Sequence, residues 1–180
     1  MTLTGMSYAE TDMTLPKPVH IQGPLLGQAH VCEPILRSLP DWFGIESAIQ
    51  RYRVEIDALP TFLAAADDGV AGFLTLKQHT DSAAEIYVMG LYPALHRRGV
   101  GRALVDRATE TLSRAGVEYL QVKTLGPARS AEYYAATRAF YTALGFRPLE
   151  DIKQRCKVVH TVKGLIGGPT SRCSGQRLRC

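Results

Sequence analysis

Cationic side chains and glycines cluster where the chain leaves a predicted strand and enters a predicted helix. The run is His96-Arg97-Arg98-Gly99-Val100-Gly101, followed by Arg102. A helix start carries about half a positive charge and N–H groups without intrahelical partners, so it is suited to bind pyrophosphate. Glycines let the backbone approach an anion closely, and basic side chains add to the attraction. The sequence therefore predicts a phosphate-binding loop, with a surface turn carrying solvated arginines as the alternative.

Two common nucleotide-binding loops do not fit this run. The lysine of a P-loop is missing, and position 104, where the dinucleotide-binding pattern places its third glycine, is Leu. Nucleotide hydrolysis by a P-loop and dinucleotide redox chemistry are therefore not indicated.

Apolar periodicity predicts the elements that position the loop. Helical spacing covers 28–39, 45–59, 100–115 and 130–144. Strands are predicted at 62–66, 70–76, 84–91, 119–124 and 158–162, with a further short strand from residue 146. Strands first, and then strands alternating with helices, favour a mixed sheet with helices on its faces. In strand 84–91, strict alternation places Glu85, Tyr87, Met89 and Leu91 together on one face.

The loop resembles the acyl-CoA-binding loop of the GNAT superfamily of N-acetyltransferases. That pattern is Gln or Arg, two residues, Gly, one residue, and Gly or Ala; here His96 takes the first position. A second segment, from Ala139 to Phe146, is similar to the family's Phe-Tyr-x-x-x-Gly-Phe. The resemblance covers about residues 20–150. It implies an α/β (α+β) fold with a mixed, mostly antiparallel central sheet flanked by helices on both faces.

The resemblance also implies an activity and a cosubstrate. A member of this family moves an acetyl group from acetyl-CoA to a primary amine by direct attack in a ternary complex. The positions that match the family's contacts with coenzyme A are Met89, Gly90, Leu91, His96, Arg97, Arg98, Gly99, Val100, Gly101, Arg102 and Arg138.

Two residues are carried over as catalytic. The resemblance assigns Tyr141 as the general acid that protonates the leaving thiolate. A phenol with a pKa near 10 holds its proton at neutral pH, as this role requires. Its alternative role is that of a half-buried helix aromatic. Glu85, fourteen residues before Gly99, matches the general base of histone-acetyltransferase-like members. Its alternatives are a charge at a strand edge and a chain of waters acting in its place.

The acceptor pocket is predicted from neighbouring positions. Lys123, Thr124 and Tyr133 are expected to line it. Trp42 and Phe43 are either a lid over the acceptor or part of the core. The histidines have no ligand spacing, so we expect no metal.

Composition sets the broad class. With 180 residues and 46% hydrophobic content, the chain is expected to form one globular domain without disulfides or a structural metal. It has no apolar run near the ~20 residues of a membrane helix. We therefore expect a cytoplasmic protein without membrane contact.

Charge is unevenly distributed along the chain. Residues 153–180 carry seven basic groups and no acidic one, which leaves the first 152 residues with a net charge of −3. We expect residues 1–18 to form a flexible N-terminal arm, 19–163 the acetyltransferase domain, and 164–180 a basic C-terminal tail. The acidic body would suit a cationic amine acceptor, either a small molecule or a peptide.

Other functions remain open at this level. The domain could bind acetyl-CoA without turnover, as a sensor or scaffold, or could use another acyl group or acceptor. The basic tail could contact nucleic acid, but it has no aromatic residue for stacking, so nucleic acid is not the expected partner. A homodimer is compatible with the resemblance.

Overall fold

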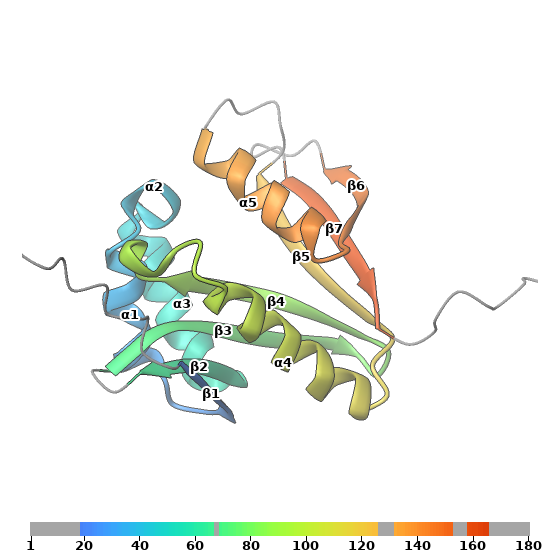
Figure 1. Cartoon of the computed structure of the whole chain (residues 1–180), viewed down its shortest axis with the longest axis horizontal. Coiled ribbons are helices and arrows are strands. Elements are labelled where there is room, and N and C mark those ends of the chain that lie inside the picture. The colour runs from blue at the N-terminus through green and yellow to red at the C-terminus, as the bar shows by residue number, and fades with distance from the viewer. Residues whose placement is uncertain (1–18, 67–68, 126–131, 153–157, 166–180) are drawn as a thin grey trace, which may run out of the picture.

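The computed structural model describes residues 19–66, 69–125, 132–152 and 158–165, to which the structural statements below refer. Its sheet has the strand order β1-β2-β3-β4-β5-β7-β6 (Figure 1). The strands are β1 (His20–Leu25), β2 (Thr61–Ala66), β3 (Gly69–Thr80), β4 (Ala83–Leu91), β5 (Tyr119–Leu125), β6 (Arg147–Ile152) and β7 (Val158–Gly164). The pair β4–β5 is parallel, and the other neighbouring pairs are antiparallel. The predicted mixed, mostly antiparallel sheet is thus confirmed.

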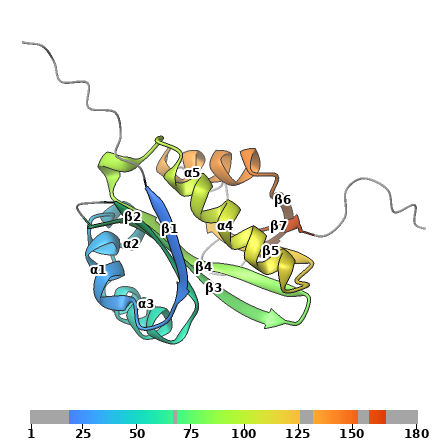
Figure 2. The ribbon, with the colours of Figure 1, turned by 60° about the horizontal axis from the view of Figure 1, so that its bottom comes forward.

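Helices cover both faces of the sheet (Figure 2). One face carries α1 (Ala29–Arg37), α2 (Pro40–Phe43) and α3 (Glu46–Ala58), and the other carries α4 (Val100–Arg114) and α5 (Glu132–Ala143). A single 3₁₀ turn, η1 (Pro93–Leu95), connects β4 to the start of α4. Each face holds its own buried cluster.

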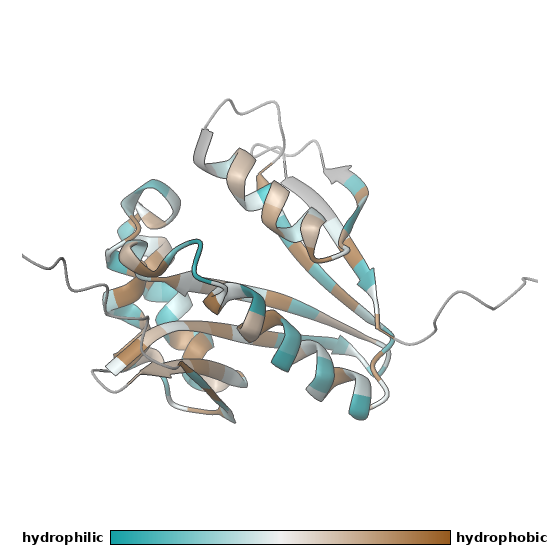
Figure 3. Ribbon diagram, viewed as in Figure 1, coloured by the Kyte–Doolittle hydropathy of each residue, from teal (hydrophilic) through white to brown (hydrophobic). Residues whose placement is uncertain are grey.

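Apolar spacing explains why the helices dock on the sheet. Leu104, Val105 and Ala108 of α4 are fully buried against one face, while Ile35 of α1 is fully buried against the other. The central strands β2, β3 and β4 are apolar over most of their length, because helices cover both faces of the sheet, whereas buried residues alternate with more exposed ones along β5 (Figure 3). Burial of this kind supplies the main stabilising free energy of the domain.

A bulge in β4 reverses the predicted alternation. Thr75 of β3 pairs with Val88, and the next β3 residue pairs with Ile86, so Tyr87 is an extra residue on β4. Ile86 packs in the α4-side cluster, whereas Val88 packs in the α1-side cluster. Glu85 precedes Ile86 and therefore faces the α1 side, whereas Met89 packs against the α4-side cluster. The prediction that Glu85 and Met89 share a face is thus wrong.

The sequence prediction differs from the fold in a few elements. It contained neither β1 nor α2, and it ended β3 at residue 76, four residues early. β7 includes Gly164, which the sequence placed in the tail. The predicted arm at 1–18 and most of the predicted tail lie outside the described residues. Within the described ranges, no helix has the length and apolar character needed to cross a membrane.

Candidate active site

The sheet opens between its two parallel strands. β4 and β5 pair from Ala83 with Tyr119 to Ile86 with Val122, and their register ends there. β4 continues to Leu91 and β5 to Leu125, and the two strands diverge (Figure 1). The divergence leaves one side of β4 without a neighbouring strand among the described residues.

Backbone groups of β4 face this opening. The N–H of Tyr92 donates to the Ala71 carbonyl of β3 at 3.1 Å, and peptide groups alternate in direction along a strand. Gly90 therefore directs its N–H and C=O to β3, and Met89 and Leu91 direct theirs to the opening. His96 Nε2 donates to the Leu91 carbonyl at 3.0 Å, which fastens the loop to the strand.

Gly90 has a packing role. A Cβ at this position would lie 3.2 Å from the Phe73 ring and 3.3 Å from Ile35, so the glycine lets α1 approach the sheet. Packing against α1 is thus sufficient to require a glycine at this position.

The two loop glycines also serve different purposes. Gly99 is the N-cap residue of α4 with φ +83°, and a Cβ there would meet nothing within 4 Å. Gly101 lies inside the helix, where a Cβ would lie 3.3 Å from the Phe140 ring of α5. Gly99 thus provides the left-handed backbone and open space before the helix, and Gly101 provides close helix packing.

Three arginines surround the helix start. Arg97, Arg98 and Arg102 are exposed, and none forms an ion pair with another described residue. Val100 buries its side chain in the core, so only its backbone is available at the loop. The loop therefore combines unneutralised positive charge with the N–H groups of the first turn of α4.

A cavity of about 140 Å³ lies at the opening, and we call it the opening pocket. Its lining residues are Trp42, Phe43, Tyr52, Ile86, Tyr87, Val88, Met89, Val122, Lys123, Thr124, Tyr134, Thr137 and Tyr141. Tyr141 is 5% exposed, and burial raises the pKa of its phenol above the ordinary value. This keeps Tyr141 in its protonated form.

Glu85 lies beside the opening pocket but does not line it. Its side chain is 5% exposed, and its Oε2 accepts hydrogen bonds from His79 Nε2 at 2.7 Å and from Lys123 Nζ at 2.9 Å. Lys123 reaches Glu85 from β5, just beyond the point where the strands separate. The buried carboxylate is thus held from both neighbouring strands.

The family described as Acetyltransferase (GNAT) domain matches residues 58–148, which is half of the chain. The chain belongs to the GNAT acetyltransferase family.

Curated relatives of this GNAT chain are mycothiol acetyltransferases. The protein from Beutenbergia cavernae is 37% identical over 86 residues, which are 46% of this chain and 27% of the relative. The protein from Nocardia farcinica is 35% identical over 116 residues, which are 59% of this chain and 35% of the relative. The chain thus spans about a third of these relatives.

Solved structures support the GNAT fold. A protein from Desulfovibrio desulfuricans, described as belonging to the GNAT family, superimposes with a TM-score of 0.71 at 20% identity, covering 83% of this chain and 100% of its own. An aminoglycoside 6'-N-acetyltransferase complexed with coenzyme A gives a TM-score of 0.63 at 15% identity, covering 84% and 99%. At these identities the likeness concerns the fold.

The GNAT chain brings some predicted acceptor residues together and not others. Lys123 and Thr124 line the opening pocket. Tyr133 falls in the first turn of α5, but its side chain lies outside the described part; the neighbouring Tyr134 lines the pocket. Arg138, which was predicted to contact coenzyme A and not the acceptor, donates to the Leu125 carbonyl at 3.0 Å and so ties α5 to the end of β5.

Trp42 lies over the opening. Its indole N–H donates to Thr137 Oγ1 of α5 at 3.2 Å, and its ring meets the edge of His96 with centroids 6.3 Å apart. This residue, considered as lid or core, is partly exposed and connects the two sides of the opening.

Several site residues were missed. His79 lies on the polar extension of β3 that sequence reasoning placed in a loop, so its approach to Glu85 was not predicted. Tyr52 and Tyr87 belong to no motif that the sequence analysis used. The apolar periodicity of α3 was the only feature that placed Tyr52 on the inner face of a helix.

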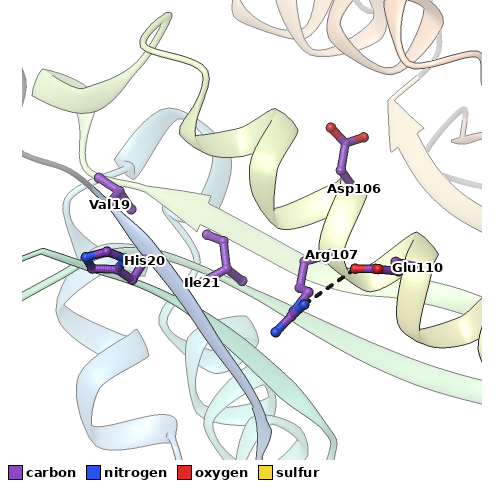
Figure 4. A pocket seen from close by; sticks show the side chains of 6 residues that line it. All are labelled: Val19, His20, Ile21, Asp106, Arg107 and Glu110. Atoms are coloured by element: carbon purple, nitrogen blue, oxygen red, sulfur yellow. Dashed lines mark hydrogen bonds and ion pairs between the residues drawn. The ribbon is translucent and has the colours of Figure 1, made fainter.

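A larger, shallower hollow lies elsewhere on the domain. It has a volume of about 570 Å³ between the β1 end of the sheet and α4, lined by Val19, His20, Ile21, Asp106, Arg107 and Glu110 (Figure 4). Arg107 and Glu110 pair across one helical turn at 3.4 Å. This hollow contains none of the predicted site residues.

Proposed function

We propose that the chain is an acetyl-CoA-dependent N-acetyltransferase, in which a primary amine attacks the thioester directly within a ternary complex. The observation that carries this proposal is the opening between β4 and β5. Met89 of β4 and Tyr141 of α5 line one pocket there, and β4 leads through a short loop to the helix start at Gly99.

Acetyl-CoA would bind along the loop and the open side of β4. The pyrophosphate accepts hydrogen bonds from the N–H groups at the start of α4, and Arg97, Arg98 and Arg102 attract its charge. The pantetheine arm follows β4, where the peptide groups of Met89 and Leu91 face outward. This places the thioester at the opening pocket.

In the reaction the amine nitrogen forms a bond to the acetyl carbon, and the carbon–sulfur bond breaks. A β4 backbone N–H stabilises the oxyanion that develops on the carbonyl. Tyr141 donates its proton to the departing thiolate. Because Glu85 does not line the pocket, the proton that the amine loses reaches this carboxylate through an intervening water.

Direct attack agrees with the residues available. None of the described residues lining the opening pocket is a cysteine. Cys32, on α1, is fully buried, and burial raises the pKa of its thiol to about 12, which keeps it from acting as a thiolate. Among the described residues, an acyl-cysteine intermediate therefore has no support.

The test is release of free thiol from acetyl-CoA in the presence of a panel of primary amines, with mass spectrometry of the products. We expect one N-acetylated amine for each coenzyme A released. Tyr141→Phe should lower kcat about 100-fold, whereas Tyr119→Phe, on an exposed ring at the start of β5, should not. Tight binding of coenzyme A without any product would instead indicate a sensor or scaffold.

A further inference from the structure

The opening pocket has two chemically different walls. On the side of α2 and α3 the wall is aromatic: the rings of Phe43 and Tyr52 lie 5.5 Å apart, and those of Tyr52 and Tyr87 lie 5.8 Å apart, both edge to face. Such a wall contacts a methylene chain or another flat, uncharged segment without offering it a charge partner.

The opposite wall, from β5 and α5, offers hydroxyl groups. Thr124 is 6% exposed, and its Oγ1 has no hydrogen-bond partner among the described residues, although the residue lines the pocket. A buried hydroxyl without a partner is unfavourable, so this atom is a candidate hydrogen-bonding position for the acceptor.

The charge of the pocket is balanced. Among the described lining residues, Lys123 alone is charged, and Glu85 Oε2 accepts a hydrogen bond from its ammonium at 2.9 Å. An acceptor that carried a second charge into this space would find no unpaired group of opposite sign among the described residues of the walls. Burying such a charge is costly.

We infer that the acceptor inserts its amine on a slender, uncharged segment that can form hydrogen bonds, and that the pocket selects against polyamines and against amino acids with a free carboxylate. The cavity of about 140 Å³ admits such a segment and not a bulky polycyclic or multiply charged one. This inference rests on the proposed function. It also means that the acidic character of the body does not select the acceptor.

Three matched acceptors test it: 5-aminopentan-1-ol, 1,5-diaminopentane and 5-aminopentanoate, which share the reacting amine and differ in the far group. We expect kcat/KM to be about tenfold or more higher for the amino alcohol than for either charged compound. An equal or higher value for the diamine or the carboxylate would overturn the inference.

Two variants test the physical cause. Lys123→Met leaves the Glu85 carboxylate without its ammonium, so the ratio of kcat/KM should shift several-fold toward the diamine. Glu85→Gln leaves the Lys123 ammonium unpaired and should shift the ratio toward the carboxylate. Ratios between acceptors cancel any loss of catalysis that is common to all three.

Arg114→Met is the control. Arg114 pairs with Glu110 at 2.6 Å on α4, and neither residue lines the pocket. Its ratios should equal those of the wild type. Unchanged ratios in both Lys123→Met and Glu85→Gln would contradict the role of the pair in selection.

A second readout separates this inference from the proposed function. Calorimetric titration of the three compounds into the full chain saturated with coenzyme A measures affinity without turnover. No acetylated product from any amine would refute the proposed function, while the order of the three affinities would still support or overturn the selection for an uncharged segment.

Discussion

Glu85 and Lys123 join the two strands where the sheet begins to open: Lys123 Nζ lies 2.9 Å from Glu85 Oε2. The carboxylate is buried and also accepts a hydrogen bond from His79. The Lys123 side chain is partly exposed, at 44%. This pair therefore links β4 to β5 at the point where their register ends.

We expect that replacing Lys123 alone lowers the free energy of unfolding more than replacing Lys123 and Glu85 together. Lys123→Met leaves a buried carboxylate with one partner fewer and should lower the free energy of unfolding by about 1 kcal/mol, less than for a fully buried pair because the lysine is partly exposed. Lys123→Met with Glu85→Gln should recover part of that loss. Denaturant unfolding of the four members of the double-mutant cycle measures it, and strictly additive effects would argue against coupling.

Gly99 and Gly116 offer a matched pair at the two ends of α4. Their φ values are +83° and +82°, and a Cβ at either meets nothing within 4 Å. Alanine at either position should therefore cost a similar free energy of unfolding, about 1 kcal/mol. Only Gly99→Ala should raise KM for acetyl-CoA, several-fold, because only Gly99 lies at the proposed pyrophosphate site. An equal rise in KM for Gly116→Ala would contradict the proposal that the Gly99 loop binds the pyrophosphate.

Thr124→Val should have opposite effects on stability and on binding. The substitution keeps the shape of the side chain but removes a buried hydroxyl that has no partner among the described residues. The free energy of unfolding should rise by about 1 kcal/mol, while KM for an uncharged acceptor should rise several-fold. Thr75→Val is the control: its hydroxyl lies 2.9 Å from that of Thr61 in the core, so its loss should lower stability without changing KM. A stabilised Thr124→Val with unaltered KM would mean that this hydroxyl does not contact the acceptor.

The raised pKa of Tyr141 predicts alkaline instability. Below pH 10 the phenol is protonated in the folded and unfolded chains, so its contribution to stability is complete. Above pH 10 the unfolded chain releases this proton first, and the free energy of unfolding falls as pH rises toward the folded-state pKa. Wild type should lose about 1 kcal/mol more than Tyr141→Phe per pH unit above 10.5. Parallel pH profiles from chemical denaturation would show that Tyr141 does not titrate differently on folding.

Much of this fold can be predicted from local sequence patterns, and the elements that were not predicted have physical explanations. The helical stripe of α4 and the apolar run of β4 were visible, because burial on one face produces them directly. β1 was not predicted because Gly23 and Pro24 read as strand breakers. α2 spans four residues and has no measurable period.

The site was predictable where a motif exists and not where contacts are long-range. The loop around Gly99 and the residues near Tyr141 have local signatures. The bulge at Tyr87 depends on the pairing of β4 with β3, so strict alternation misplaced Glu85 relative to Met89. His79 reaches Glu85 across a hairpin, and no property of its own sequence neighbourhood indicates that contact.

The central claim is that the thioester and the amine meet in one complex at the opening between β4 and β5. Initial rates measured while acetyl-CoA and an amine acceptor are varied together test it most directly. The account predicts double-reciprocal lines that intersect, as for a sequential mechanism. Parallel lines, together with an acetylated form of the chain isolated in the absence of acceptor, would contradict it.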